Sequence, residues 1–425
     1  MAPAMISILI LALCIILFVA RPIPNAVTAC LGCLLFVLTG ICSVSEAFSG
    51  FSNSTVLLMF GMMVVGIAMG DTGIARLIGQ KVTQWSGRDE RRFILLAGGT
   101  SALMSTFLSN TAVIAIFLPI IASVSQADSR MNRKNLTLPV TMGAMFGGVC
   151  TLVGSTPQLT ANGILAAMTG KELGMFDYSL PGALIFLVYM GYVLLIGYPM
   201  GKKIWGTEQM EQWKAEQVKE TAPPVANPKK MVAMGIIFAF TIVFFIGGWL
   251  PTAVTAIIAA IACLVTGCTT QKSVIKNMDW SVVFVLAGCL GIATGINNGG
   301  AGELLGEAVS SVLHEGIHPV VIFGIFVVLT MIISNFITNS TAVVIVLPIA
   351  LSLCAANGLN TIPFTLGIVF AANLTFSTPL ANAQTAMTLV AGYKFSDYIR
   401  YTWLLDILVL VAILCVIPLL YPLTF

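Results

Sequence analysis

Long apolar runs follow one another along almost the whole chain. Eight of them approach the roughly 20 residues that a helix needs to cross about 30 Å of hydrocarbon. They lie at about residues 4–20, 23–40, 54–70, 182–200, 231–250, 252–267, 281–297 and 401–423. The first run is not followed by a small-residue cleavage site, so we interpret it as a retained span and not as a signal peptide. The pattern predicts an all-α integral membrane protein with helical spans and not a barrel.

Composition agrees with this prediction. Of the 425 residues, 58% are hydrophobic and 9% are charged, whereas roughly 25% of residues are charged in an average soluble domain. The ten Cys are scattered, mostly inside the apolar runs, and Cys30 and Cys33 fall within one of them. We interpret them as small packing residues and not as metal ligands or disulfides.

Positive charge is concentrated in three loops. Residues 76–92, 130–134 and 202–230 hold fourteen of the twenty Lys and Arg, and by counting spans they share one side of the membrane. Loops rich in Lys and Arg stay in the cytoplasm. On this count Lys171 and both chain termini are external, and we expect a multi-pass protein of the cell (inner) membrane. Such solvated anchoring loops give no indication of nucleic acid binding.

The second half of the chain repeats the first. A shift of 227 residues places PNAVTA (24–29) on PTAVTA (251–256), and a shift of 229 places Asn110 on Asn339. Residues 202–230 form the linker between the copies. Each copy has an odd number of crossings, so we expect the second to be inverted relative to the first. Inverted repeats are common in secondary transporters, where substrate binds near the midplane, although channels and receptors can also have repeats.

Two polar triplets interrupt apolar segments at matching places. Ser109-Asn110-Thr111 lies inside residues 93–122, and Thr338-Asn339-Ser340 lies inside residues 322–353. The apolar stretch before each triplet is about 24 Å long as a helix, which is too short to cross comfortably. We predict a re-entrant helical hairpin in each repeat, entering from the cytoplasm in the first and from outside in the second. The triplets could simply cap the returning helices, but their pairing at membrane depth also suggests a binding site.

Two further segments are too long for one span and are broken in the centre. Residues 139–169 and 364–392 each carry Ser-Thr-Pro at the break, at 155–157 and 377–379. Proline suits the first turn of a new helix but not the middle of one. We therefore predict two half-helices in each segment, with a helix start that attracts an anion and unwound carbonyls that can bind a cation. A proline kink alone would explain either break considered singly.

The predicted site contains no titratable side chain. No Asp, Glu, His, Lys or Arg interrupts the hairpins or the broken helices, and the nearest acids, Asp71 and Asp406, lie towards span ends. A proton carrier at the midplane usually needs such a group. We therefore expect the driving ion to be Na⁺, held by neutral oxygens, and transport to survive collapse of a proton gradient.

With these motifs the chain resembles the divalent anion:sodium symporter family, the dicarboxylate and citrate transporters of the ion transporter superfamily. The resemblance rests on the two triplets, each followed by an apolar run and Leu-Pro. It extends over nearly the whole chain, although we expect the family's usual extra N-terminal span to be missing. It implies a homodimer with an elevator mechanism. Residues 1–92 and 231–315 would form the scaffold, residues 93–201 and 316–425 the transport parts, and residues 202–230 a cytoplasmic linker.

The resemblance also implies which residues bind ions and substrate, with no cofactor besides Na⁺. The first Na⁺ site would consist of Ser105, Ser109, Asn110, Gly154 and Ser155. The second would consist of Ser334, Thr338, Asn339, Ser377 and Thr378. Substrate would contact Ser109, Asn110, Thr111, Thr156 and Pro157 in the first repeat, and Thr338, Asn339, Ser340, Thr378 and Pro379 in the second.

The breaks depart from the family pattern. Where the family often has Thr-Pro-Pro-Asn, this chain has Thr156-Pro157-Gln158-Leu159 and Thr378-Pro379-Leu380-Ala381. These positions help to line the substrate pocket in the family, so the substrate class stays open.

Several functions are compatible with the sequence. The leading hypothesis is Na⁺-coupled import of small organic anions, with C4-dicarboxylates first. Alternatives are a transporter of sulfate, sulfonate or another oxyanion, an anion exchanger and, least favoured, an ion channel, because channels tend to place such loops around a symmetric pore. An enzyme is a poor interpretation: His314, Glu315 and His318 are near one another, but no second cluster completes a metal site.

Overall fold

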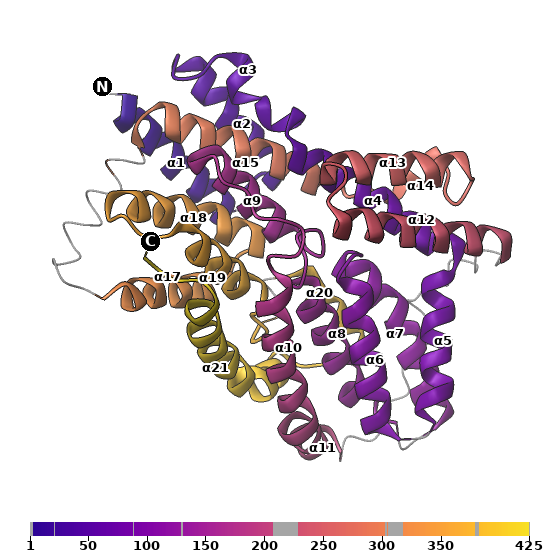
Figure 1. Cartoon of the computed structure of the whole chain (residues 1–425). Helices are drawn as coiled ribbons and strands as arrows, with labels where there is room; N and C mark the ends of the chain where they lie inside the picture. Colours follow the sequence, from indigo (N-terminus) through magenta and orange to yellow (C-terminus); the bar gives the residue numbers. More distant parts are fainter. Residues whose placement is uncertain are drawn as a thin grey trace.

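The structure is a computed structural model that describes residues 3–20, 22–87, 89–128, 131–206, 228–301, 304, 318–378 and 382–424. Within these ranges the regular elements are helices, apart from one isolated bridge between Leu359 and Thr424. Seven of the described helices are long and apolar enough to cross a membrane. The prediction of an all-α, multi-pass membrane protein is confirmed (Figure 1).

The first half of the chain forms a series of helices joined by short turns. In chain order they are α1 (Pro3–Ala20), α2 (Asn25–Leu38), α3 (Val44–Ala47), the 3₁₀ turn η1 (Ser49–Ser52), α4 (Ser54–Thr72), α5 (Ile74–Ser86), α6 (Glu90–Ser105), α7 (Asn110–Ala127), α8 (Arg133–Gly148), α9 (Thr156–Thr169), α10 (Ser179–Tyr192), the π turn η2 (Val193–Gly197) and α11 (Tyr198–Trp205). The last three form one continuous span of 27 residues.

The described elements of the second half follow a similar order. They are α12 (Pro228–Gly247), α13 (Thr252–Val265), α14 (Gln271–Asn277), α15 (Trp280–Asn298), α17 (Pro319–Ser334), α18 (Asn339–Ala356), α19 (Thr361–Asn373), α20 (Ala383–Met387), the 3₁₀ turn η3 (Thr388–Ala391) and α21 (Phe395–Leu420). Most of the predicted linker, residues 207–227, lies outside the described residues.

Helix lengths show that the chain is built from two repeats. The pairs α2 and α13, α4 and α15, α6 and α17, and α7 and α18 have 14, 19, 16 and 18 residues per helix. α2 and α13 also begin in the same way, directly after Pro24 and Pro251. They end before Gly40 and Gly267, whose φ angles of 73° and 68° suit glycine. The repeats and the predicted hairpins are therefore confirmed.

Small residues let the helices of each repeat approach closely. A Cβ atom at Gly147 of α8 would overlap with Ala102 O of α6, and one at Gly61 of α4 would lie 2.6 Å from the carbonyl carbon of Ala256 of α13. Helices in membranes associate largely through such close contacts, because lipid provides little hydrophobic drive. The helices form two packing groups. In the first, α4 packs with α12 and α13, and α15 packs with α1 and α2. In the second, the hairpin helices pack with α8 and α19.

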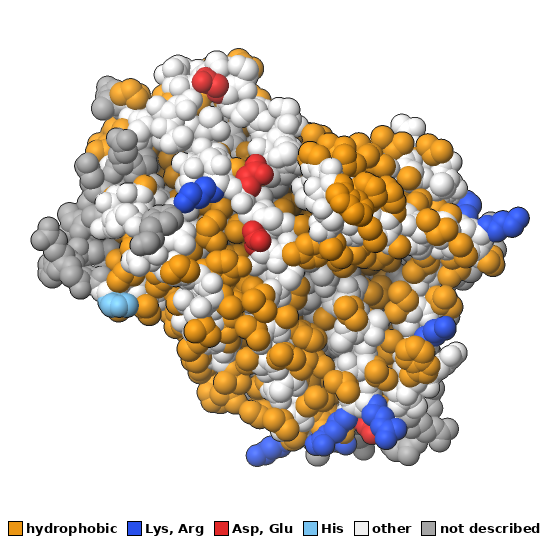
Figure 2. Space-filling model, in the orientation of Figure 1, with side chains coloured by type: hydrophobic (Ala, Val, Ile, Leu, Met, Phe, Trp, Pro, Cys, Tyr) orange, Lys and Arg blue, Asp and Glu red, His pale blue; other side chains and the backbone are white. Residues whose placement is uncertain are grey.

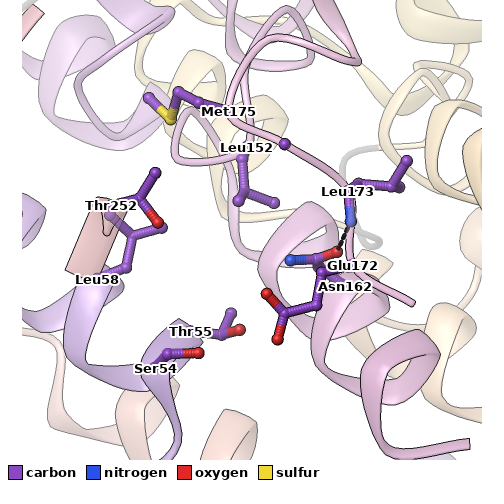
Figure 3. Close-up of a pocket in the computed structure, with 10 residues that line it drawn as sticks. Ser54, Thr55, Leu58, Leu152, Asn162, Glu172, Leu173, Met175 and Thr252 are labelled. Atoms are coloured by element: carbon purple, nitrogen blue, oxygen red, sulfur yellow. Dashed lines mark hydrogen bonds between the residues drawn. The ribbon is translucent and has the colours of Figure 1, made fainter. Parts of the chain in front are cut away.

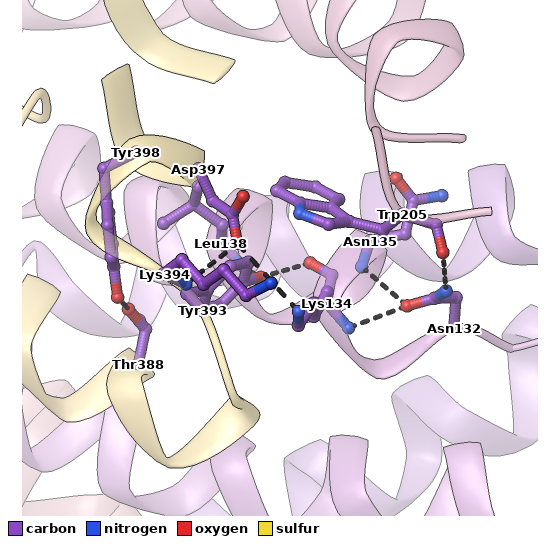
Figure 4. Close-up of polar contacts among 10 residues, drawn as sticks. All are labelled: Asn132, Lys134, Asn135, Leu138, Trp205, Thr388, Tyr393, Lys394, Asp397 and Tyr398. Carbon is purple, nitrogen blue, oxygen red and sulfur yellow. Dashed lines mark hydrogen bonds and ion pairs between the residues drawn. The ribbon is translucent and has the colours of Figure 1, made fainter. Parts of the chain in front are cut away.

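Polar contacts join the two repeats at the start of α8 (Figure 4). Tyr393, just before α21, donates a hydrogen bond to Lys134 O and accepts one from Leu138 N at 3.0 Å. Its hydroxyl thus lies between two groups that would otherwise bond to each other in the helix. Lys134 Nζ also lies 3.9 Å from Asp397 Oδ2. The N-terminal turn of α8 is therefore held by the second repeat.

The outer surface is largely apolar (Figure 2). Leu195, Val265 and Leu419 are 77%, 81% and 82% exposed, as lipid-facing side chains would be. Lys and Arg gather along the lower edge and at the right of the view in Figure 2.

Candidate functional site

Each hairpin turns within four residues. Residues 106–109 join α6 to α7, and residues 335–338 join α17 to α18. Each returning helix begins at the asparagine of its triplet. Ser109 is the N-cap of α7, since its Oγ accepts a hydrogen bond from Ala112 N at 3.3 Å.

The two triplet asparagines bind the serine that ends the preceding helix. Ser105 Oγ donates to Asn110 Oδ1. In the second repeat Ser334 Oγ lies 3.2 Å from Asn339 Oδ1, and it also donates to Ala372 O at 2.6 Å. A capping side chain would instead accept from a backbone amide. The interpretation of the asparagines as helix caps is wrong, because their oxygens are turned to these serines.

The first broken helix has the predicted form. α8 ends at Gly148 and α9 begins at Thr156, with Pro157 in its first turn. Asn110 is packed against Gly148, where a Cβ would overlap with Asn110 Oδ1, and a Cβ at Gly154 would overlap with Gly148 O. Asn110 and Gly154 of the predicted first Na⁺ site therefore lie together, around a glycine that the sequence did not single out.

Gln158 closes this break from within. Its side chain is fully buried, and its Nε2 donates to Gly148 O at 2.7 Å and to Thr151 O at 3.3 Å. Its Oε1 accepts from Ser155 Oγ, and from Asn373 Nδ2 at 3.3 Å. Ser155, predicted as a Na⁺ ligand, thus faces Gln158 and the end of α19. The two broken helices meet at this amide.

The second break differs from the prediction. α19 ends at Asn373, and the next helix, α20, begins at Ala383 and not at the Ser-Thr-Pro sequence. Asn382 supplies the cap, since its Oδ1 accepts from Thr385 N at 2.7 Å. Asparagine is among the strongly preferred N-cap residues, which accounts for a helix start at this position. Pro379 lies outside the described residues.

A threonine of each break holds the tip of the neighbouring hairpin. Thr378 Oγ1 donates to Asn335 O at 2.6 Å, and Thr151 Oγ1 donates to Thr106 O. Thr338 of the predicted second Na⁺ site instead has its Oγ1 2.6 Å from Thr341 Oγ1.

Asp406 reaches the second break, contrary to the expectation that it lies towards a span end. α21 begins at Phe395, where Lys394 N donates to Asp397 Oδ2 at 2.9 Å, so Asp406 is the twelfth of its 26 residues. The Asp406 carboxylate accepts hydrogen bonds from Ser377 Oγ and from Phe376 N. Ser377 is therefore turned towards α21. The premise that only neutral side chains surround the site is wrong.

The predicted substrate residues differ in exposure. Ser109 and Thr111 are exposed, Asn110 and Pro157 are buried, and the others are half-buried: Thr156, Thr338, Asn339, Ser340 and Thr378. The sequence missed the contributions of Gly148, Gln158, Asn373 and Asp406. A buried amide or acid in an apolar segment was the available signal for all of these except Gly148.

A cavity of about 220 Å³ lies beside the first break (Figure 3). It is lined by Leu152 of the break, by Asn162, by the loop with Glu172, and by Ser54 and Thr252 at the starts of α4 and α13. No residue of either triplet lines it. Glu172 would repel an anion, so the cavity itself is a poor anion site.

The histidines offer no alternative site among the described residues. His318 caps α17, with its Nδ1 3.3 Å from Val320 N. His314 and Glu315 lie outside the described residues. No group of three His, Cys, Asp or Glu side chains that could hold a metal occurs in the part of the chain that the structure describes.

A protein-family model matches most of the chain. Residues 15–339 and 316–424 match the model of the family described as citrate transporter. The chain belongs to the citrate transporter family. This membership supports the resemblance drawn from the hairpin triplets and identifies the protein as a secondary transporter of this kind.

Individual relatives agree with this assignment. The chain is 30% identical over 193 residues to the uncharacterized transporter sll0640 of Synechocystis, covering 45% of this chain but only 31% of that relative. It is 22% identical over 410 residues to the sodium-dependent dicarboxylate transporter SdcS of Staphylococcus saprophyticus, covering 88% of this chain and 78% of SdcS. The crystal structure of the YdaH transporter of Alcanivorax borkumensis has the same fold, with a TM-score of 0.68 at 12% identity over 99% of this chain and 98% of that one.

Proposed function

We propose that this family member imports small organic anions, C4-dicarboxylates first, together with Na⁺. The observation that carries the proposal is the pair of Ser-Asn contacts at the hairpin tips. Ser105 with Asn110, and Ser334 with Asn339, each place a hydroxyl and an amide oxygen against the end of a half-helix, α8 or α19. Neutral oxygens and helix-end carbonyls are ligands that suit Na⁺ in transporters.

The anion would bind where helix starts converge on these oxygens. α7 and α18 begin at Asn110 and Asn339, and α9 begins at Thr156. The free amides of a helix start, together with its dipole, favour a carboxylate. The asparagine amide group can donate to the same carboxylate while its oxygen meets the cation. The name of the relative SdcS, a sodium-dependent dicarboxylate transporter, supports this choice of ion and substrate.

We infer an elevator movement within a homodimer. Residues 1–92 and 231–315 would form the fixed scaffold, and residues 93–201 and 316–425 would move. The packing within each part supports this division, since α4 packs with α12 and α13, α15 with α1 and α2, and the hairpins with α8 and α19, while α9 packs against α15 and α4 where the two parts meet. α5 packs against both α4 and the hairpin helices α6 and α7. By the distribution of Lys and Arg, the termini would face outwards from the inner membrane.

Uptake into proteoliposomes tests the proposal. Purified protein would be reconstituted and supplied with labelled succinate, citrate or sulfate, with Na⁺ or choline outside and with equal pH on both sides. We expect succinate uptake to require Na⁺ and to be lost in the Asn110→Ala and Asn339→Ala variants. Equal uptake in choline, or a preference for sulfate over both carboxylates, would contradict the proposal.

A further inference from the structure

Asp406 lies in the middle of a membrane helix without a basic partner. It is half-buried in α21, and the structure gives it no ion pair among the described residues. Its oxygens are met by Ser377 Oγ and by Phe376 N at 3.3 Å, both in the second break. An unpaired carboxylate at this depth is costly, and such residues usually belong to the path of an ion.

An unsatisfied oxygen lies in the same region. Asn335, in the tip of the second hairpin, donates from Nδ2 to Met331 O at 2.9 Å, but its buried Oδ1 has no hydrogen-bond partner. Buried polar atoms are normally paired, so an orphaned oxygen indicates a missing donor or cation. Asn335 and Asp406 line the same open surface groove of about 170 Å³. Its other walls are apolar: Val328, Met331, Ile332, Ile407 and Leu410.

The remaining oxygens of this region come from hydroxyl groups. Ser377 Oγ lies 3.2 Å from Thr402 Oγ1, one turn before Asp406 on α21. Thr375 in the same break is fully buried, and its Oγ1 also lacks a hydrogen-bond partner. One carboxylate surrounded by amide and hydroxyl oxygens is a donor set for a hard cation.

We propose that Asp406, Asn335 and Ser377 bind a monovalent cation, Na⁺ in the working transporter. One carboxylate neutralises one positive charge, whereas divalent cations are usually held by several carboxylates or phosphates. This site is separate from the Ser334 and Asn339 contact, because Ser377 is turned to α21. The inference rests on the proposed function, since it adds a charged ligand to a Na⁺-coupled carrier.

The site would also link the cation to the hairpin. Asn335 belongs to the hairpin tip, Asp406 to α21 and Ser377 to the break, so a bound cation would connect all three elements. The tip is already fixed to the break through Thr378 Oγ1 and Asn335 O, 2.6 Å apart. Binding of the cation would therefore hold the tip of the second hairpin against the break and α21.

Direct cation binding without any anion tests this site. The purified full chain in detergent would be titrated with ²²Na⁺ at constant ionic strength, with choline as the replacing ion. We expect Asp406→Asn to lose one bound Na⁺ or to weaken its binding by roughly tenfold or more, since the variant removes the ligand's charge. Asn335→Ala and Ser377→Ala should weaken the same binding less, and they carry the test if Asp406→Asn does not fold.

Asp71→Asn is the matched control. Asp71 lies at the end of α4, in the proposed scaffold, where it accepts from Thr269 Oγ1 at 2.6 Å. Its replacement should leave the number and affinity of bound Na⁺ unchanged. Normal Na⁺ binding in all three variants of the site would overturn the inference and leave the proposed function standing. If the unaltered protein bound no Na⁺ at all, Na⁺ coupling itself would fail.

Discussion

Replacement of Gln158 by leucine removes the hydrogen bonds that close the first break while keeping a side chain of similar size. The largest effect is on Gly148 O, which loses the hydrogen bond that Gln158 Nε2 donates to it at 2.7 Å. The helical donor that would replace it, Leu152 N, is already bonded to Met175 O at 3.0 Å. A buried carbonyl left without a donor costs roughly 1–3 kcal/mol.

The other partners of Gln158 lose less. Thr151 O keeps Gly154 N at 3.4 Å, and Asn373 Nδ2 keeps Val369 O at 2.9 Å. Their lost bonds add on the order of 0.5–1.5 kcal/mol in total, the ordinary net value of one hydrogen bond. The free energy of unfolding should therefore fall by about 2–4 kcal/mol.

Thermal unfolding of the purified protein, followed by tryptophan fluorescence, measures this loss. We expect the Tm of Gln158→Leu to fall by about 3–8 °C and succinate binding to weaken, because residues 149–155 lose their anchor. Gln126→Leu, at an exposed position near the end of α7, is the control and should change stability by less than about 0.5 kcal/mol. Equal Tm values for the two variants would refute the reasoning, since Gly148 O would then have found another donor.

Three further outcomes follow from the contacts. Asn110→Ser should keep the α7 cap, which belongs to the preceding serine, but reduce Na⁺-dependent uptake by roughly 5-fold to 150-fold; uptake near that of the unaltered protein would show that the amide is dispensable. Gly147→Ala should destabilise the protein by about 1–3 kcal/mol through overpacking against α6, whereas Gly99→Ala, with open space around its Cβ position, should be tolerated; unfolding curves of both variants decide this. A membrane-impermeant thiol reagent should label Lys171→Cys from outside and Lys203→Cys only from inside, in a background without reactive native cysteines; the opposite pattern would reverse the topology.

The fold could be predicted because its signals are local and occur twice. Helical spans follow from apolar length, and hairpins follow from a polar triplet in a segment too short to cross. The starts of α7 and α18 fall on the triplets themselves, at Asn110 and Asn339. The start of α20 was missed because two signals compete there. Proline at 379 favours an early start, whereas Asn382 provides a better cap. The backbone carbonyl of Asn382 also accepts a hydrogen bond from the amide of Ala386, four residues later.

The site was less predictable because its central contacts join distant residues. Ser155 and Asn373 are 218 residues apart, yet Ser155 Oγ lies 2.9 Å from Asn373 Oδ1. Ser377 and Asp406 are 29 residues apart and belong to different elements. The periodicity of apolar residues along the chain does not predict which distant residues contact each other. The apolar run at 401–423 also hid the true start of α21, so Asp406 was assigned to a span end although it is central in the helix.

The two breaks differ in charge, although four pairs of helices outside them have equal lengths in the two repeats. In the first break a neutral amide, Gln158, donates to carbonyls that a cation could otherwise bind, so a cation there would have to compete with its hydrogen bonds. In the second break the Asp406 carboxylate, hydrogen-bonded to Ser377 Oγ and Phe376 N, is the ligand for the Na⁺ that we propose. If this carboxylate moves with the transport part, an unoccupied carrier would take one negative charge across the membrane, at a cost set by the membrane potential. A Na⁺ on Asp406, as we propose, would remove that charge without contributing to neutralisation of the substrate. The charges of a dicarboxylate would then have to be balanced by the Na⁺ ions proposed at the Ser105–Asn110 and Ser334–Asn339 contacts. The two hairpins and the break would thus have separate tasks in coupling.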